Sequence, residues 1–245
     1  MSDTPRPSSI QSSIHLKGDL SDPPSRGLWL VKWLLIIPHL FPLLFLTIAV
    51  FFVGIIAFFA VLFTGTYPRK MFDFVVGVAR WWWRIEFYSY GVLGTDLYPP
   101  FSLKSKEDYP ADLHIDYPDA LNNWLPLVKW FLAIPHYLIL VAFFGTSIEL
   151  PASYASEFAY GKAGHFRKFS DWYMMEGNHI EDFSIAFPGL IGILLIIVAI
   201  ILLFTGKYQK DIYRFIMGIQ RWGYRVYAYV FLLTDEYPHF RLMEE

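Results

Sequence analysis

The sequence predicts an all-α integral membrane protein with two tandem repeats, each a transmembrane helical hairpin followed by an amphipathic interfacial helix, and with a small cytoplasmic β cap. Three observations lead to this prediction. Hydrophobic residues make up 55% of the 245 residues and charged residues only 17%, which is a small charged fraction for a soluble protein. The ranges 33–63 and 183–205 contain no formally charged residue. Several motifs also occur twice.

The two copies align over nearly the whole chain. VKWLLIIPH at 31–39 matches VKWFLAIPH at an offset of 97, whereas LFTGTY at 62–67 and FVVGVARWWWR at 74–84 match LFTGKY and FIMGIQRWGYR at an offset of 141. TDLYPPFSL at 95–103 resembles TDEYPHFRL at 234–242. The second copy therefore contains 44 additional residues. The sequence predicts four units: a flexible arm without a signal-peptide core (1–25), a first membrane repeat (26–103), a linker (104–123), and a second membrane repeat (124–245) with a polar insertion at 147–182.

These motifs, present in both halves, resemble the bacterial membrane family known as domain of unknown function 4389. The resemblance implies a membrane-embedded protein and no particular activity, cofactor or ligand. The insertion in the second half departs from the shorter repeat pattern.

The position of the insertion predicts how each uncharged run folds. Long insertions occur in loops outside the bilayer, so we expect a turn at the equivalent point of the first copy, near Ala49. Helices over 28–46 and 50–64 would then form a hairpin, with lengths of about 28 Å and about 22 Å. The alternative is one long helix kinked at Pro38 and Pro42. Because the hairpin places the basic segments on one side, the sequence predicts a multi-pass protein of the inner membrane with both termini cytoplasmic.

A third helix of each copy, beginning at 69 and near 210, carries a polar stripe with two arginines. These are Arg80 and Arg84 in the first copy and Arg221 and Arg225 in the second. Tryptophans at 81–83 and 222 favour the headgroup level, so the arginines are predicted to contact lipid headgroups or a partner. The other interpretation is that they form internal ion pairs.

Two further residue types are repeated inside the apolar runs. Lys32 and Lys129 are predicted to extend to the cytoplasmic boundary, where they would contact headgroups or a partner. His39 and His136 follow prolines, and an imidazole could satisfy a carbonyl that the proline leaves without a donor. A polar contact between helices, or a shared haem or metal ion, are the alternatives for the histidines. Short alternating segments predict strands for the cap at IHL (14–16), LHI (113–115), FSL (101–103) and FRL (240–242).

Composition and motifs indicate a function without catalysis. The chain has no cysteine, which excludes disulfides and thiolate chemistry, and its net charge of −2 gives no support for nucleic-acid binding. We find no catalytic constellation, so no enzyme activity and no cofactor is predicted, although a bound phospholipid would fit. The sequence favours a membrane scaffold or accessory subunit that contacts lipids and partner subunits. A lipid-handling or transport module built from two repeats is the alternative.

Overall fold

The computed structural model describes residues 13–20, 24–150, 183–187 and 189–242. The first copy comprises a 3₁₀ turn, a long helix and an amphipathic helix: η1 (Leu28–Leu30), α1 (Lys32–Thr64) and α2 (Arg69–Tyr88). The second copy comprises α3 (Leu125–Leu132), α4 (Ile134–Phe144), α7 (Gly189–Thr205) and α8 (Lys210–Val230). Strand β1 (Ile14–Gly18) pairs antiparallel with β2 (Ala111–Ile115), and β3 (Thr146–Leu150) pairs antiparallel with β4 (Phe183–Phe187).

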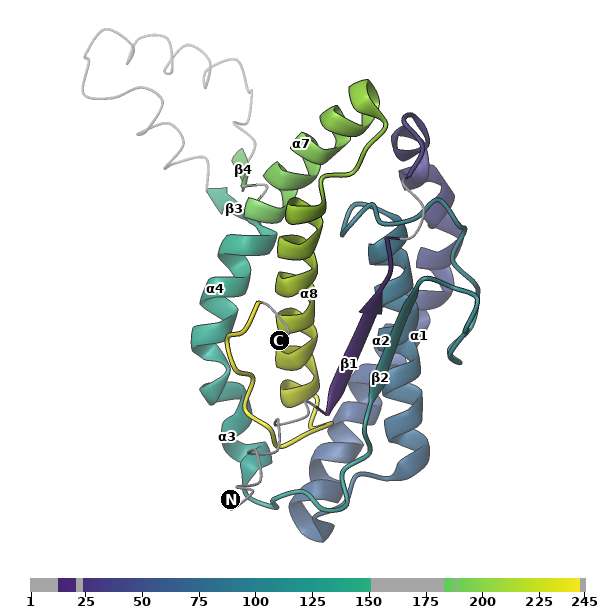
Figure 1. Cartoon of the computed structure of the whole chain (residues 1–245). Coiled ribbons are helices and arrows are strands. Elements are labelled where there is room, and N and C mark those ends of the chain that lie inside the picture. Colours follow the sequence, from purple (N-terminus) through teal and green to yellow (C-terminus); the bar gives the residue numbers. More distant parts are fainter. Residues whose placement is uncertain (1–12, 21–23, 151–182, 188, 243–245) are drawn as a thin grey trace, which may run out of the picture.

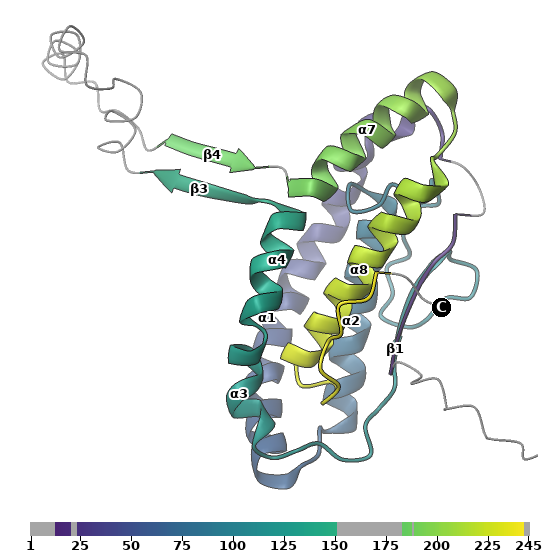
Figure 2. The same cartoon turned by 60° about the vertical axis from the view of Figure 1, so that its left-hand side comes forward.

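These elements form three layers, which Figure 2 shows from the side. The first layer contains α1 and the α3–α4–α7 segment, the second contains α2 and α8, and the β1–β2 sheet covers the second (Figures 1 and 2). The sheet buries Ile14, Leu16 and Leu113 against the helices and exposes His15 and His114. The core therefore lies between the layers, and the outer side of the first layer stays exposed.

The hairpin predicted for residues 33–63 was wrong, because α1 is a single helix of 33 residues that contains Pro38 and Pro42. Its buried residues form one stripe along its whole length. Leu43, Val50 and Ala57 lie seven residues apart, so they share one face, which packs against α2. A turn near Ala49 would split this stripe. The long helix was the alternative that the prolines indicated.

The second copy builds an equivalent of α1 from three pieces. Ile191, Val198 and Leu202 of α7 are buried, as are the residues of α1 at an offset of 141. α4 ends at Phe144 and α7 begins at Gly189, so the intervening range 145–188 is the insertion of 44 residues. Of the insertion predicted at 147–182, residues 151–182 lie outside the described residues. Long insertions can thus leave a helix at its middle as well as at a turn.

Glycine residues make this departure from the helix feasible. Gly145 has a φ of 86° and Gly189 a φ of 63°, values that side chains with a Cβ rarely adopt. The two glycines lie against each other, since a Cβ on Gly189 would come within 2.3 Å of the Gly145 nitrogen. The chain therefore leaves and re-enters the helical segment at almost the same point.

The repeated LFTG motif ends the long helix in both copies. Gly65 and Gly206 both have a φ of 66°, and the backbone N–H of each closes the last helical turn. Thr64 and Thr205 donate hydroxyl hydrogen bonds of 2.7 Å to the carbonyls four residues earlier. The motif is therefore a helix C-cap that has been duplicated with the fold.

The two copies are antiparallel, and the start of each lies at the end of the other. Arg26 packs against Gly206, and the equivalent Asn123 packs against Gly65. Asn123 also donates a hydrogen bond of 3.1 Å to the Leu62 carbonyl. Figures 1 and 2 show α1 and the α3–α4–α7 segment running in opposite directions. The copies are thus related by a pseudo-twofold axis perpendicular to the long helices.

Among the described helices, α1 alone is long and apolar enough to cross a bilayer by itself. α3 and α4 reach this length together, with a bend of 41° between them, and α7 has 17 residues. Few residues of α1 are buried, which distinguishes it from a core helix of a soluble protein. This favours association with a membrane.

The predicted interfacial placement of the third helices was wrong. α2 and α8 lie between the first layer and the sheet, and Trp81, Trp83 and Trp222 are buried. The indole of Trp82 donates a hydrogen bond of 3.1 Å to the Thr47 hydroxyl on α1. The aromatic residues thus fill the core instead of marking a headgroup level. Strands β1 and β2 coincide with the IHL and LHI segments, whereas FSL and FRL lie in loops.

Candidate functional site

Lys32 lies at the start of α1, and its side chain is fully buried. Its ammonium nitrogen is 3.0 Å from Asp96 Oδ1, donates a hydrogen bond of 2.7 Å to the Thr95 carbonyl and lies 4.6 Å from the centre of the Tyr88 ring. Asp96 also accepts a hydrogen bond of 2.5 Å from the Ser25 backbone N–H. The ion pair therefore joins the start of the long helix to the loop that follows α2.

The second copy repeats this arrangement. The Lys129 ammonium is 2.6 Å from Asp235 Oδ1, donates a hydrogen bond of 2.7 Å to the Thr234 carbonyl and lies 5.0 Å from the centre of the Tyr229 ring. Asp235 accepts a hydrogen bond of 2.6 Å from the Asn122 backbone N–H. The lysine–aspartate pair is thus part of the duplicated framework.

The prediction that Lys32 and Lys129 extend to the membrane boundary was wrong, because each has a carboxylate partner inside the protein. Burial by itself raises the pKa of Asp96, but hydrogen bonds from Ser25 and Lys32 outweigh it and hold this pKa below its usual value. Asp96 is therefore charged at neutral pH. A buried charge needs such a partner, which explains why the lysine and the TD dipeptide occur in both copies.

His39 lies in a box of aromatic side chains within the first copy. Its Nδ1 accepts a hydrogen bond of 3.1 Å from the Trp81 indole N–H, and its ring stacks on Phe101 with centroids 3.9 Å apart. The Tyr98 ring is 4.9 Å away. We call this group the first histidine box. His39 therefore makes a polar contact between helices, which is one of the predicted alternatives, and does not serve a carbonyl freed by proline.

His136 occupies the equivalent second histidine box. Its ring centroid is 5.5 Å from that of Trp222 and 5.1 Å from that of Tyr237, and Phe240 lies 4.8 Å from Trp222. In the described part of the chain, neither ring nitrogen of His136 has a hydrogen-bond partner, and neither does the Trp222 indole. Each histidine packs within its own copy. The described residues contain no group of three or more potential ligands that could hold a metal ion.

The arginines of α2 bind strand β2 and the loop that leads to it. Arg80 donates hydrogen bonds of 2.7 Å to the carbonyls of Leu103 and Leu113. Arg80 and the fully buried Arg84 each lie 3.1 Å from the Asp112 carboxylate. These are internal pairs, the second of the two roles that the sequence left open.

Arg225 of α8 has internal partners as well. Arg225 donates hydrogen bonds of 3.3 Å to the His239 carbonyl and 2.6 Å to the Arg241 carbonyl, and its Nε donates one of 3.4 Å to the Arg221 carbonyl. Arg84 likewise donates hydrogen bonds to the carbonyls of Ser102 and Lys104, so the equivalent arginines, Arg84 and Arg225, hold the segment around the end of TDxYPxF against the helix in both copies.

The glycine one turn before these arginines allows the loop to approach. A Cβ on Gly77 would come within 2.9 Å of Leu103, and a Cβ on Gly218 would come within 2.1 Å of the Leu242 carbonyl oxygen. Loop docking therefore explains much of the repeated G-x-x-R-W motif. In both copies the glycine provides space and the tryptophan enters the histidine box, and in the first copy the arginine, Arg80, binds carbonyls.

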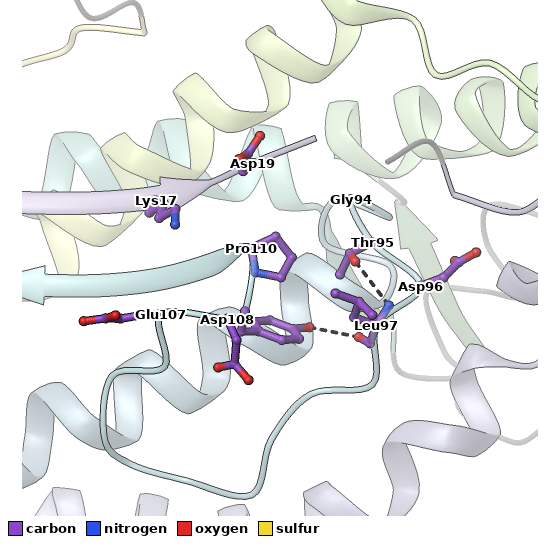
Figure 3. Close-up of a pocket in the computed structure, with 10 residues that line it drawn as sticks. Lys17, Asp19, Gly94, Thr95, Asp96, Leu97, Glu107, Asp108 and Pro110 are labelled. Carbon is purple, nitrogen blue, oxygen red and sulfur yellow. Dashed lines mark hydrogen bonds between the residues drawn. The ribbon is translucent and has the colours of Figure 1, made fainter. Parts of the chain in front are cut away.

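A pocket of about 460 Å³ lies beside the first lysine–aspartate pair (Figure 3). Its wall is held by hydrogen bonds of 3.2 Å from the Leu97 N–H to the Thr95 hydroxyl and from the Tyr109 hydroxyl to the Leu97 carbonyl. Its carboxylates belong to Asp19, Asp96, Glu107 and Asp108. In Figure 3 these carboxylates diverge, so they do not form a ligand set around a common point.

Sequence reasoning missed the partners of the residues that it selected. Asp96, Asp235, Asp112 and the box tryptophans are what give the lysines, arginines and histidines their roles. One sequence signal could have identified these partners: the dipeptides TD and RW recur in both copies together with the lysine and the histidine. Reading those repeats as contacts would have paired Lys32 with Asp96.

Comparison of the chain with curated proteins finds no match, and neither does comparison with solved structures. A family model described as a domain of unknown function (DUF4389) matches residues 26–102 and 186–241, which is more than half of the chain. The first range contains α1 and α2, and the second contains α7 and α8, consistent with two tandem copies. The chain therefore belongs to the DUF4389 family.

Proposed function

We propose that this protein is a non-catalytic component of the bacterial cytoplasmic membrane that serves as a scaffold or accessory subunit of a larger assembly. The observation that carries this proposal is the exposed outer side of the first layer, here called the apolar face. On α1 it includes Phe41 and Phe63, which are 71% and 76% exposed. In the second copy it includes Leu138 and Phe204, which are 70% and 75% exposed.

The extent of the apolar face supports a lipid environment. α1 alone is about 50 Å long at 1.5 Å per residue, and large apolar side chains are exposed along all of it. Soluble monomers rarely expose an apolar patch of more than a few hundred Å². A surface of this size requires lipid or partner helices to cover it.

The internal contacts of the polar residues favour a scaffold function over a transport function. Transporters place polar groups and broken helices near the bilayer midplane, around a substrate. Here the duplicated lysines, arginines and aspartates hold each copy's own loops to its helices. These bonds stabilise the fold of each copy and do not surround a substrate site.

The β3–β4 hairpin supports the presence of a partner. It forms a sheet of two strands only, and it projects away from the β1–β2 sheet (Figure 2). Within the described chain, its outer edges have no further strand, and such edges are sites at which another chain can add. A partner subunit would cover them.

One observation favours the lipid-handling alternative. A pocket of about 670 Å³ lies where the end of α1 meets the start of α3, at the border of the apolar face. Its apolar walls are accompanied by two amide side chains, and it is lined by Leu62, Phe63, Asn122, Asn123, Trp124 and Leu127. Apolar walls beside two amides suit the binding of one amphiphile, whose chain would contact the walls and whose polar group would contact the amides.

Two experiments test the proposal. Membranes from cells that produce the full chain are washed with alkaline carbonate, which releases peripheral proteins; we expect the chain to stay in the pellet, and release would contradict membrane embedding. The protein is then purified in mild detergent and analysed by native mass spectrometry. Partner subunits in a fixed ratio support the scaffold function, whereas the chain alone with bound lipid would favour the alternative.

A further inference from the structure

The polar β1–β2 sheet and the apolar face lie on opposite sides of the molecule. The first layer carries the apolar face, and the β1–β2 sheet at the other side exposes polar residues (Figure 2). In that sheet region the side chains of His114 and Asp116 are 65% and 58% exposed. Polarity therefore changes across the layers and not along the helices.

The antiparallel copies restrict how such a molecule can sit in a bilayer. Lys70 follows the end of α1, and Lys210 follows the end of α7, at opposite ends of the first layer. If the long helices crossed the bilayer, these equivalent basic ends would lie on opposite sides of it, against the positive-inside rule. The polar sheet would also lie at the depth of the hydrocarbon, where exposed charged groups are costly.

The length of α1 points the same way. A helix of about 50 Å exceeds a hydrocarbon core of about 30 Å, so an upright α1 would leave a large part of its apolar face in water. Lying parallel to the bilayer, the same helix can bury all of that face at one depth. All the exposed apolar residues along α1 then contact acyl chains, which is consistent with their being apolar from one end of the helix to the other.

We propose that α1 and the α3–α4–α7 segment lie parallel to the membrane plane within the cytoplasmic leaflet, with α2, α8 and the β1–β2 sheet above them on the cytoplasmic side. The pseudo-twofold axis then coincides with the membrane normal, and both copies present equivalent faces to the lipid. This inference rests on the proposed membrane function and specifies the surface and the partner: the acyl chains of one leaflet, bordered by headgroups at the basic ends.

The β3–β4 strand pair leaves the first layer on the lipid side (Figure 2). Because open sheet edges are costly in hydrocarbon, the proposed orientation requires the partner subunit to cover the edges of this pair. The helices, and not this hairpin, carry the proposed orientation. A variant that lacks residues 145–188 must therefore keep the same depth profile, which makes it the second protein in the experiment.

The test measures the depth of three positions along α1. Single cysteines replace Phe41, Phe52 and Phe63 in this cysteine-free chain, and each is labelled with a small fluorophore in liposomes of phosphatidylcholine and phosphatidylglycerol. Quenching by lipids with a nitroxide near the headgroup is compared with quenching by lipids with a nitroxide near the chain end. Lys106→Cys, which lies in an exposed loop of the polar side, is the control outside the bilayer.

We expect the three positions to give the same ratio of shallow to deep quenching, with and without residues 145–188, and Leu138→Cys of the second copy to agree with them. A deep middle position with shallow ends, or a steady change along the helix, would show a crossing helix and overturn the parallel orientation while leaving the membrane function intact. Absence of quenching by either lipid at all positions would overturn the membrane function itself.

Discussion

The Tyr224 hydroxyl donates a hydrogen bond of 3.1 Å to the Glu86 carboxylate and so joins α8 of the second copy to α2 of the first. Beside it, the Gln220 amide donates a hydrogen bond of 3.2 Å to the Gly91 carbonyl. Burial raises the pKa of Glu86 to about 7, although the hydrogen bond from Tyr224 acts in the opposite direction. The charge of Glu86 therefore changes near neutral pH at the boundary between the copies.

Because Glu86 lies at this boundary, we predict that the free energy of unfolding depends on pH. Because the pKa of Glu86 is higher in the folded state, the folded chain binds more protons than the unfolded chain between about pH 4.5 and about pH 7. The contribution of Glu86 to the free energy of unfolding is therefore greatest at low pH and is lost as the pH rises through this window. Thermal unfolding in detergent should show Glu86→Gln to be less sensitive to pH than the unaltered chain. Equal pH dependence of the two proteins would refute the role of Glu86.

The lysine–aspartate pairs predict a strong asymmetry between buried and exposed ion pairs. Asp96→Asn leaves the fully buried Lys32 without a counter-charge and should lower the free energy of unfolding by about 3 kcal/mol. Asp73→Asn removes an exposed pair with Arg69 and should change it by less than about 1 kcal/mol. Chemical unfolding in detergent measures both. Similar losses for the two variants would show that burial of the pair does not matter.

The insertion should be removable without loss of the fold. Deletion of residues 145–188 joins Phe144 to Gly189, whose backbones already lie in contact, and restores the spacing of α1. We expect circular dichroism and cooperative thermal unfolding to show that the shortened protein, in which α4 would continue directly into α7, is folded. As a control, deletion of 145–190 rotates α7 by about 200° and should misplace its buried stripe. If both deletions behaved alike, the alignment of α3–α4–α7 with α1 would be wrong.

The two histidine boxes differ in one hydrogen bond, so equivalent substitutions in the two boxes measure its contribution to stability. Trp81 donates its indole N–H to His39, whereas the Trp222 indole has no partner among the described residues. Both tryptophans are buried, so replacement by phenylalanine removes similar volume from each. Trp81→Phe should therefore destabilise the protein by about 1 kcal/mol more than Trp222→Phe. Melting temperatures of the two variants test this, and an equal shift would argue against the bond.

Much of the organisation could be predicted from the sequence. The duplication, the 44-residue insertion and the strands near 14–16 and 113–115 all have local signals, namely repeated motifs and alternation of residue types. The continuity of α1 could not be predicted in this way. An uncharged run of 31 residues has the same composition whether it forms one helix or two, and only the spacing of Leu43, Val50 and Ala57 against α2 decides between them.

The roles of the charged residues were harder to predict, because they depend on contacts distant in sequence. Lys32 and Asp96 are 64 residues apart, and a lysine near the start of an apolar helix is equally compatible with a position at the membrane boundary. The aromatic surroundings of His39 come from α2 and from the loop that follows it. The tertiary structure, not the local pattern, determines that these groups are buried.

In the proposed orientation, both copies present their apolar face to one leaflet and their basic ends to one side of the membrane. The most direct measurement uses two equivalent exposed positions at opposite ends of the first layer, Lys70→Cys and Asp211→Cys, each in a chain without other cysteines. An impermeant thiol reagent is added to intact cells and to inverted membrane vesicles. We predict that both cysteines react in inverted vesicles and that neither reacts in intact cells. Reaction of the two cysteines from opposite sides would contradict the account, because it would require the long helices to cross the bilayer.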